Sequence, residues 1–196
     1  MTARPPAGAA APADAAPEAT PAAAPDLTAD PTADLVAGDP AGPLAGMPGL
    51  LGVDHVGVAV PDLEAAVEWH TRVLGLVVVH RETNDEQQVE EAMLAAPGSP
   101  PGAAQVQLLA PTDPGSTLAR FLTRSGPGLQ QLAYRVQDVV AAAAHLRAHG
   151  VRVLSEEPRR GTAGSLVVFA HPKDCGGVLV ELVQPARAPD GTDVGV

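Results

Sequence analysis

The sequence predicts an α+β fold built from two similar β-α-β-β-β halves. Two observations lead to this prediction. A strand pattern that runs into a helix start occurs at residues 54–62 and again at 130–138, so that His55 and Gln131 lie 76 positions apart. The strands that would close the halves also correspond, because 107–111 matches 181–185 at a spacing of 74. The same element order at nearly the same spacing indicates an internal duplication.

The first half opens with a strand over 53–60, where valines alternate with small residues. Apolar side chains then recur at three- and four-residue steps up to Gly75, a natural stop, which predicts a helix over 61–74. The other elements expected in this half are strands at 76–81, 89–95 and 104–110, followed by a connecting helix at 113–124.

The second half repeats this plan. Asp138 is a natural helix N-cap and Gly150 a natural stop, so the alanine-rich segment 138–149 is predicted to be helical. The strands expected around this helix are 129–136, 151–154, 165–170 and 177–183.

The composition separates a tail from the folded region. Residues 1–49 are dominated by Ala and Pro and offer little aliphatic and no aromatic surface to bury, so we expect them to be disordered. The folded domain is expected over residues 50–187, with modules at about 53–112 and 128–185. A flexible C-terminal tail is expected at 188–196.

The formal net charge of the chain is −11. One basic and six acidic side chains in the first 49 residues contribute −5 of this charge, which leaves −6 on the remainder. An acidic folded region has no basic face that could bind phosphates, so we do not expect a nucleic-acid partner.

Cys175 is the only cysteine, which excludes an internal disulfide and fits a reducing compartment. No run approaches the roughly 18 apolar residues of a membrane span, and the N-terminus lacks the basic start and apolar block of a secretory signal. We therefore expect a cytoplasmic protein without a membrane partner.

Four polar side chains occupy equivalent positions in the duplicated strands. His55 and Gln107 lie on the first and last strands of the first half, and Gln131 and Glu181 lie on those of the second. Their neighbours along the strands are apolar or small, so ordinary surface alternation does not account for all four. Taken singly, His55 could be a structural residue at a strand end that makes ordinary hydrogen bonds. Gln107 and Gln131 could be ordinary polar residues of a strand. The duplication favours a shared metal site.

Several segments resemble the vicinal oxygen chelate superfamily and, within it, the methylmalonyl-CoA epimerase family. The strand and helix entry at 53–62 carries the superfamily pattern. Two segments are more specific: NDEQQVEEAML at 84–94 and HPKDCGGVLVEL at 171–182. The other matching segments are 106–111, 121–135 and 157–162, so that the resemblance spans residues 53–184.

The resemblance implies that the two modules form a cupped, barrel-like mixed sheet around a divalent metal ion. It implies metal ligands at His55, Gln107, Gln131 and Glu181, and acid/base carboxylates at Glu91 and Glu181. A donor set of one imidazole, two amide oxygens and one carboxylate favours cobalt, with manganese or magnesium as alternatives.

The reaction implied by the resemblance is the epimerisation of (2R)- and (2S)-methylmalonyl-CoA, in which a proton leaves C2 on one face and returns on the other. The partner would be a small-molecule acyl-CoA, and a homodimer is expected from the resemblance alone. Two departures stand out. Relatives commonly have His-His where this chain has Gln130-Gln131, and Gln88 stands where glycine is usual.

Other functions remain open at this level. The chain could prefer ethylmalonyl-CoA, or it could be a glyoxalase-type lyase in which the second carboxylate is idle. A metal-free small-molecule-binding resistance module is a third alternative, although apolar residues would then be expected at the ligand positions. Glu91 could instead belong to a solvated acidic face with Glu86 and Glu90. Four residues could meet the substrate carboxylate or the CoA phosphates, or could be simple loop residues: Arg159, Arg160, His171 and Lys173.

Overall fold

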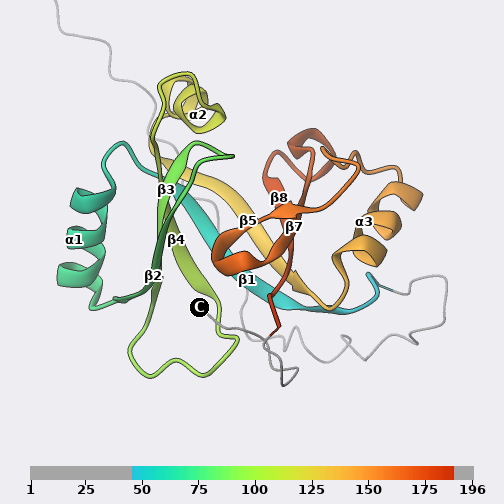
Figure 1. Cartoon of the computed structure of the whole chain (residues 1–196), viewed down its shortest axis with the longest axis horizontal. Helices are drawn as coiled ribbons and strands as arrows, with labels where there is room; N and C mark the ends of the chain where they lie inside the picture. The colour runs from blue at the N-terminus through green and yellow to red at the C-terminus, as the bar shows by residue number, and fades with distance from the viewer. Residues whose placement is uncertain (1–45, 188–196) are drawn as a thin grey trace, which may run out of the picture. The chain divides into compact units, whose positions relative to one another are not determined.

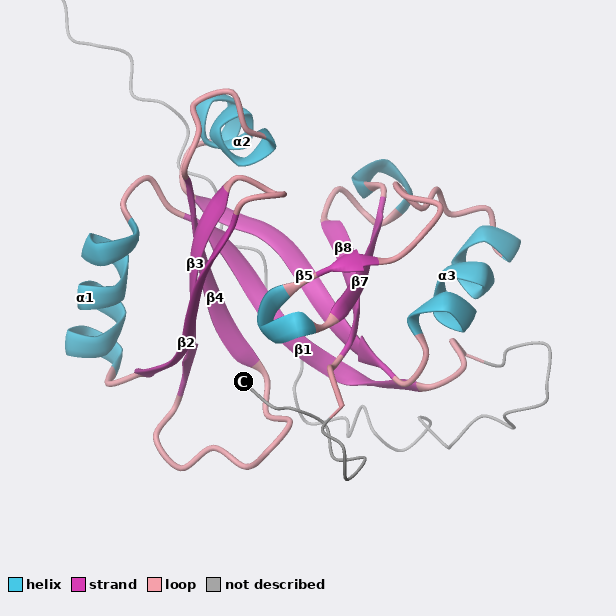
Figure 2. Ribbon diagram, in the orientation of Figure 1, coloured by secondary structure: helices cyan, strands magenta, loops and turns pink. Residues whose placement is uncertain are grey.

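The computed structural model describes residues 46–187. These residues form an eight-stranded sheet in the order β2-β3-β4-β1-β5-β8-β7-β6 (Figures 1 and 2). The sheet mixes parallel and antiparallel pairs and curls on itself, with α1 and α3 on its outer sides. The predicted α+β class with a cupped mixed sheet is confirmed. The disordered tails were expected at 1–49 and 188–196, of which only 46–49 lie within the described residues.

Two central strands join the halves. β1 (Leu50–Ala59) and β5 (Gly128–Val136) pair antiparallel. On the β1 side the sheet continues through β4 (Gln105–Pro111), β3 (Val89–Ala95) and β2 (Val77–Asn84), and on the β5 side through β8 (Leu179–Gln184), β7 (Leu166–Ala170) and β6 (Arg159–Arg160).

The duplication is visible in the strand register. In the parallel pair of β1 and β4, Gly57 lies opposite Gln107, and in the parallel pair of β5 and β8, Ala133 lies opposite Glu181. Ala133 follows Gly57 by 76 positions and Glu181 follows Gln107 by 74, which are the two spacings found in the sequence. The internal repeat therefore corresponds to two halves with the same strand pairing.

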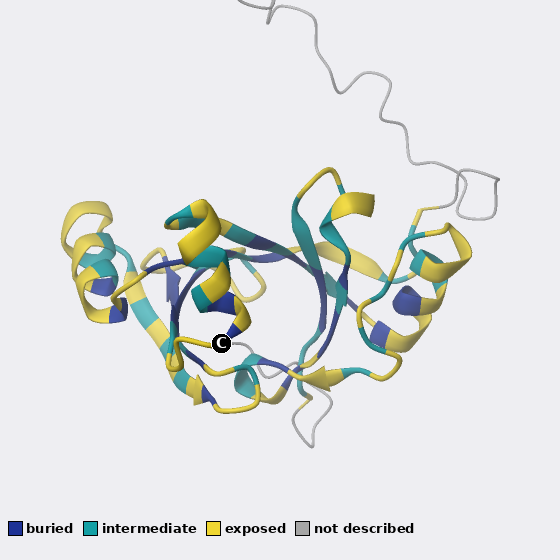
Figure 3. Cartoon of the chain, turned by 90° about the horizontal axis from the view of Figure 1, so that it is seen from above, coloured by how far each residue is buried: buried dark blue, intermediate teal, exposed yellow. Residues whose placement is uncertain are grey.

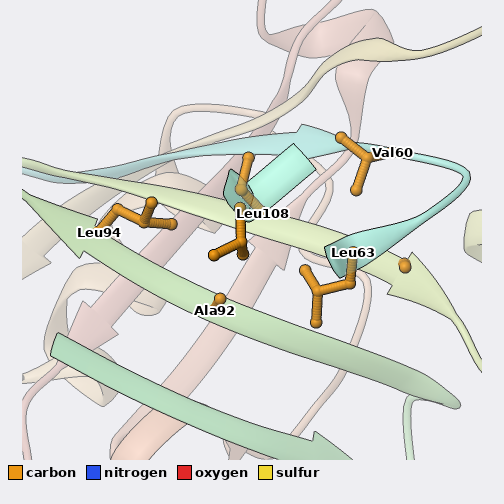
Figure 4. Close-up of a cluster of buried hydrophobic side chains, with 7 residues drawn as sticks. Val60, Leu63, Ala92, Leu94 and Leu108 are labelled. Carbon is orange, nitrogen blue, oxygen red and sulfur yellow. The ribbon is translucent and has the colours of Figure 1, made fainter. Parts of the chain in front are cut away.

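Helix α1 (Leu63–Leu74) covers the outer face of the first half. The Asp62 carboxylate accepts a hydrogen bond from the Ala65 amide at 2.9 Å and caps the helix, and Gly75 ends it with a φ of +70°. Figure 4 shows the cluster between this helix and the strands, in which Leu63 lies beside Ala92 of β3 and Leu108 of β4. Burial of these apolar side chains holds the helix on the sheet.

Helix α3 (Val139–Ala148) has the corresponding place in the second half. The Asp138 carboxylate caps it by accepting hydrogen bonds from the amides of Val140 and Ala141. Both α1 and α3 bury the side that faces the sheet and expose the other (Figure 3). In consequence, alternate side chains of the strands point away from these helices and into the curl of the sheet.

Two sequence predictions are wrong in detail. Residues 151–154 do not form a strand; they make a single bridge, between Val153 and Ala170. The Arg152 amide donates instead to the Asp174 side chain at 3.1 Å, which ends the pairing. The connecting helix α2 (Thr117–Ser125) begins at Thr117 rather than at 113, because Ser116 provides the cap.

Two short 3-10 turns complete the described fold, η1 (Thr162–Gly164) and η2 (Pro172–Asp174). Between Gly46 and Arg187, none of the helices has the length and apolar character needed to cross a bilayer.

Candidate active site

The structure brings the four predicted ligands together inside the curl of the sheet. Leu108 packs under α1, so strand alternation turns its neighbour Gln107 to the opposite face. Gln107 of β4, His55 of β1 and Glu181 of β8 converge on Gln131 of β5. All four residues are only 2 to 6% exposed. Polar groups so far from water need partners, and these four find them in one another.

A single amide nitrogen lies at the centre of this cluster. Gln131 Nε2 is 2.6 Å from Glu181 Oε2, 3.1 Å from Gln107 Oε1 and 3.3 Å from His55 Nε2. His55 Nε2 is also 3.1 Å from Glu181 Oε2. Two oxygen atoms and one ring nitrogen thus surround this amide nitrogen, and all three are atom types that can coordinate a cation.

The donor set fits a divalent metal ion. The two ends of a glutamine amide can exchange places by rotation, and this would present Gln131 Oε1 to the centre beside His55 Nε2, Gln107 Oε1 and Glu181. Among residues 46–187, no cluster of three or more His, Cys, Asp or Glu side chains could hold a metal. The cluster combines one histidine and one glutamate with two glutamine amides.

Glycine at position 57 allows Gln131 to reach the cluster. Gly57 of β1 lies directly opposite Gln131 of β5 in the antiparallel pair. A Cβ atom at position 57 would overlap the Cγ of Gln131. The absence of a side chain at Gly57 therefore makes room for the Gln131 side chain on the neighbouring strand.

His55 is held by a chain of two further side chains. Its Nδ1 lies 2.8 Å from Asp54 Oδ1, and the other oxygen of Asp54 accepts from Arg135 Nε at 2.7 Å. This arrangement leaves Nε2 facing the cluster. Asp54 and His55 are neighbours in a strand, yet both are buried, because the pairing of β1 with β5 is irregular between Val53 and His55.

The charges around His55 shift two pKa values. Burial acts to raise the pKa of Asp54, but hydrogen bonds and attraction from His55 and Arg135 outweigh it and lower the pKa. Burial acts to lower the pKa of His55, but the Asp54 and Glu181 carboxylates outweigh it and raise the pKa to about 9. Without a metal, His55 is thus an imidazolium at neutral pH.

The predicted base Glu91 lies next to the ligand cluster. Glu91 Oε2 accepts from Gln107 Nε2 at 2.9 Å, and Glu91 Oε1 accepts from the Thr162 hydroxyl at 2.6 Å. Gln107 Nε2 also lies 3.1 Å from Thr162 Oγ1. Because Glu91 and Thr162 occupy this nitrogen, Gln107 turns its oxygen toward the cluster.

Only 4% of Glu91 is exposed, so this residue does not belong to a solvated acidic face with Glu86 and Glu90. Burial raises its pKa to about 7; the Thr162 hydrogen bond opposes the shift, while the negative charges of Glu82 and Glu181 add to it. A carboxyl group with this pKa changes protonation state near neutral pH, as general acid/base chemistry requires.

Glu82 supports the loop that carries Thr162. Glu82 lies opposite Glu91 on the neighbouring strand, and its Oε2 accepts from the Ala163 amide at 3.0 Å and lies 2.8 Å from His80 Nε2. This contact ties η1 of the second half to β2 of the first. The Thr162 hydroxyl is thereby held against Glu91.

Two adjoining cavities lie on this side of the sheet, and the first of them reaches the cluster. The first, of about 270 Å³, reaches Gln131 and has apolar walls that include Val89, Leu109 and Phe169. The second, of about 480 Å³, lies between α2 and η2 and shares Thr117, Gln130, Leu154 and Leu179 with the first. A molecule that enters the second cavity can therefore extend toward the cluster.

The other candidate residues separate into two groups. Arg159 lines the first cavity and His171 lines the second. Arg160 and Lys173 line neither of these cavities. Cys175 is partly buried with a raised pKa, first because of burial and then because of nearby Asp174, so it is a poor nucleophile.

Sequence reasoning missed four residues that support the site: Asp54, Glu82, Arg135 and Thr162. Asp54 precedes a ligand, but regular alternation would turn it to the other face of the sheet. Arg135 and Thr162 reach the site from partners 81 and 71 positions away, a distance over which local patterns carry no signal.

The chain is similar to known proteins in sequence and in fold. The pattern of the Glyoxalase/Bleomycin resistance protein/Dioxygenase superfamily matches residues 54–169. The chain is 38% identical over 134 residues to the ethylmalonyl-CoA/methylmalonyl-CoA epimerase of Cereibacter sphaeroides, a match covering 67% of this chain and 96% of that protein.

Two solved structures are also similar. The crystal structure of methylmalonyl-CoA epimerase from Mycobacterium tuberculosis has 54% sequence identity and a TM-score of 0.67, over 72% of this chain and 92% of that one. A variant of the Streptomyces coelicolor methylmalonyl-CoA epimerase in complex with 2-nitronate-propionyl-CoA has 46% identity and a TM-score of 0.65, over 70% and 99%. The chain therefore belongs to the Glyoxalase/Bleomycin resistance protein/Dioxygenase superfamily, and its relatives there include methylmalonyl-CoA epimerases.

Proposed function

We propose that this chain epimerises (2R)- and (2S)-methylmalonyl-CoA at a divalent metal ion bound by His55, Gln107, Gln131 and Glu181. The observation that carries the proposal is a continuous chain of hydrogen bonds that places one carboxylate at each end of the ligand cluster. It runs from Glu91 to Gln107 at 2.9 Å, on to Gln131 at 3.1 Å and on to Glu181 at 2.6 Å.

Epimerisation at C2 needs a base on each face of the carbon. Glu91 removes or returns the proton on one face, and Glu181 does so on the other, with their roles exchanged for the reverse reaction. With a pKa of about 7, Glu91 is available in both forms near neutral pH. When bound, a divalent ion would neutralise the negative charge that develops on the substrate oxygens.

The donor set supports cobalt, manganese or magnesium rather than zinc. It contains one imidazole nitrogen and oxygen donors from two amides and one carboxylate, and the only cysteine of the chain is Cys175, outside the cluster. Oxygen-rich sites without thiolate suit these ions.

The second cavity is suited to the CoA portion of the substrate. Three cationic or potentially cationic side chains line it: Arg120, Arg124 and His171. The Arg120 side chain donates to Thr117 Oγ1 at 3.0 Å, whereas the Arg124 side chain has no hydrogen bond or ion pair with any residue between Gly46 and Arg187. On an acidic protein, this group of side chains offers a place for phosphates. The acyl part would then occupy the first cavity, beside the cluster.

The homodimer and the cytoplasmic location expected from the sequence stay predictions. Sedimentation velocity on the purified chain would measure its oligomeric state.

The decisive experiment is deuterium wash-in at C2 of methylmalonyl-CoA in deuterium oxide, with metal-loaded wild-type protein and the variants Glu91→Gln and Glu181→Gln. Wild-type protein should exchange the C2 proton and invert the centre, and both variants should lose inversion. Glu90→Gln is the matched control, because Glu90 precedes Glu91 on β3 and the strand turns it to the opposite face. It should behave like wild type.

Metal analysis separates the two carboxylates. The Glu91→Gln variant should retain its metal, whereas the Glu181→Gln variant should bind the metal more weakly. Of the two carboxylates, only Glu181 is proposed to coordinate the ion. A parallel assay with ethylmalonyl-CoA would establish which acyl chain is preferred. Absence of C2 exchange in metal-loaded wild-type protein would refute the epimerase proposal and leave a lyase or a binding module.

A further inference from the structure

Gln88 has a backbone conformation that is unfavourable for its residue type. Its φ is +57°, in the left-handed region that suits glycine because a Cβ atom crowds the backbone there. Within residues 46–187, Ala163 is the only other non-glycine residue with a positive φ. Glycine at position 88 would avoid the strain, so the glutamine side chain needs an explanation.

The surrounding hairpin imposes this conformation on position 88. Asn84 Oδ1 accepts from the Gln87 amide at 3.0 Å and shapes the turn between β2 and β3. The Gln88 carbonyl oxygen accepts from the Thr112 amide at 3.0 Å, and Val89 is buried. These contacts involve the backbone and its neighbours, so the strain does not depend on the Gln88 side chain.

The Gln88 side chain contributes nothing visible to the fold. It makes no hydrogen bond to the described part of the chain and it is exposed. It lines the first cavity, together with Gln131 of the ligand cluster and Gln130. A polar group is thus held at the mouth of the candidate active site with its donors and acceptor unused. Strained backbone at such a place is typical of residues that contact a ligand.

We propose that the Gln88 amide binds the substrate by hydrogen-bonding an amide of the pantetheine arm of the acyl-CoA. This inference rests on the proposed function. The arm joins the reacting acyl group near the cluster to the phosphates at the second cavity, so it has to pass along the first. It carries secondary amides, and the first is only two carbons from the sulfur. A glutamine side chain is matched to such a group because it donates and accepts at once.

The test compares wild type with Gln88→Gly and Gln88→Ala. Both variants lose the side-chain amide, so each should show a KM for methylmalonyl-CoA about 2- to 10-fold higher, with kcat little changed, because the contact is the same in the ground and transition states. Only Gln88→Gly relieves the backbone, so it should raise Tm by about 2 to 4 °C. Ala163→Gly is the stability control, because it relieves the other strained position.

Truncated substrates identify the contact. The methylmalonyl thioester of N-acetylcysteamine retains the first amide of the arm, and the thioester of propanethiol has none. The Gln88→Gly variant should lose several-fold in kcat/KM on the first and nothing on the second. Equal losses on both thioesters, or no loss on methylmalonyl-CoA, would overturn the proposal while leaving the epimerase function intact. Wild-type protein that turns over no methylmalonyl thioester would contradict both.

Discussion

Replacing Glu91 by glutamine should make the metal-free protein more stable at alkaline pH and should lower the activity of the metal-loaded protein at least about 100-fold. The folded state raises the pKa of Glu91 to about 7 from its ordinary value of 4.5, mainly through burial. Between these two values the folded state holds a proton that the unfolded state has lost. The stability of wild-type protein therefore falls as pH rises through this window.

The magnitude follows from the two pKa values. A difference of about 2.5 units corresponds to about 3 kcal/mol at a pH above both values. Glutamine at position 91 carries no charge and avoids this penalty. Its amide, however, can no longer accept both hydrogen bonds, because Gln107 Nε2 and the Thr162 hydroxyl each donate to Glu91. The loss of one of these bonds costs about 1 kcal/mol.

The two effects combine into a pH-dependent difference between variant and wild type. At about pH 8 the Glu91→Gln variant should be more stable by about 2 kcal/mol, and at about pH 5 the difference should be close to zero. Urea denaturation of both proteins in the presence of a chelator, at several pH values, measures it. Activity with metal restored should fall at least about 100-fold.

Glu90→Gln provides the control for the change in charge, because it lies on the same strand and is only partly buried. It should show no comparable pH dependence. If the stability difference between Glu91→Gln and wild type were the same at about pH 5 and about pH 8, Glu91 would titrate normally and its assignment as a buried acid/base group would be refuted.

Four further results are expected. His55→Ala should lose bound metal, because it removes the only imidazole of the cluster; full metal content by elemental analysis would contradict the ligand set. Asp54→Asn should weaken Co²⁺ binding about 10- to 100-fold, measured by absorbance titration, because His55 loses its carboxylate partner; unchanged affinity would make Asp54 dispensable. In wild-type protein, metal affinity should increase with pH up to about 9, because the His55 proton has to leave; flat affinity would contradict this. Arg124→Ala should raise KM for methylmalonyl-CoA but not for the N-acetylcysteamine thioester, which has no phosphates. Arg72→Ala on α1 is the control, and equal effects of the two variants on KM would exclude phosphate binding by Arg124 in the second cavity.

Much of the fold could be predicted from the sequence, because its signals are local or are repeated. Apolar periodicity and the caps Asp62 and Asp138 lie within a few residues of the elements that they define, and β3 has the predicted bounds of 89–95. The duplication carried information over longer distances. Equivalent strands in two like halves place equivalent side chains around one centre, so His55 and its three partners could be grouped before any distance was known.

Only the tertiary structure decided how those groups are held. The irregular pairing of β1 with β5 lets Asp54 and His55 lie together, against the alternation that a regular strand would impose. Residues 151–154 have a strand-like pattern, but the Asp174 side chain takes the amide of Arg152. Thr162 and Arg135 reach Glu91 and Asp54 through contacts that no local pattern encodes. Composition and periodicity constrain which face of a strand is buried, whereas the pKa of a buried carboxyl group depends on which few atoms the complete fold places around it.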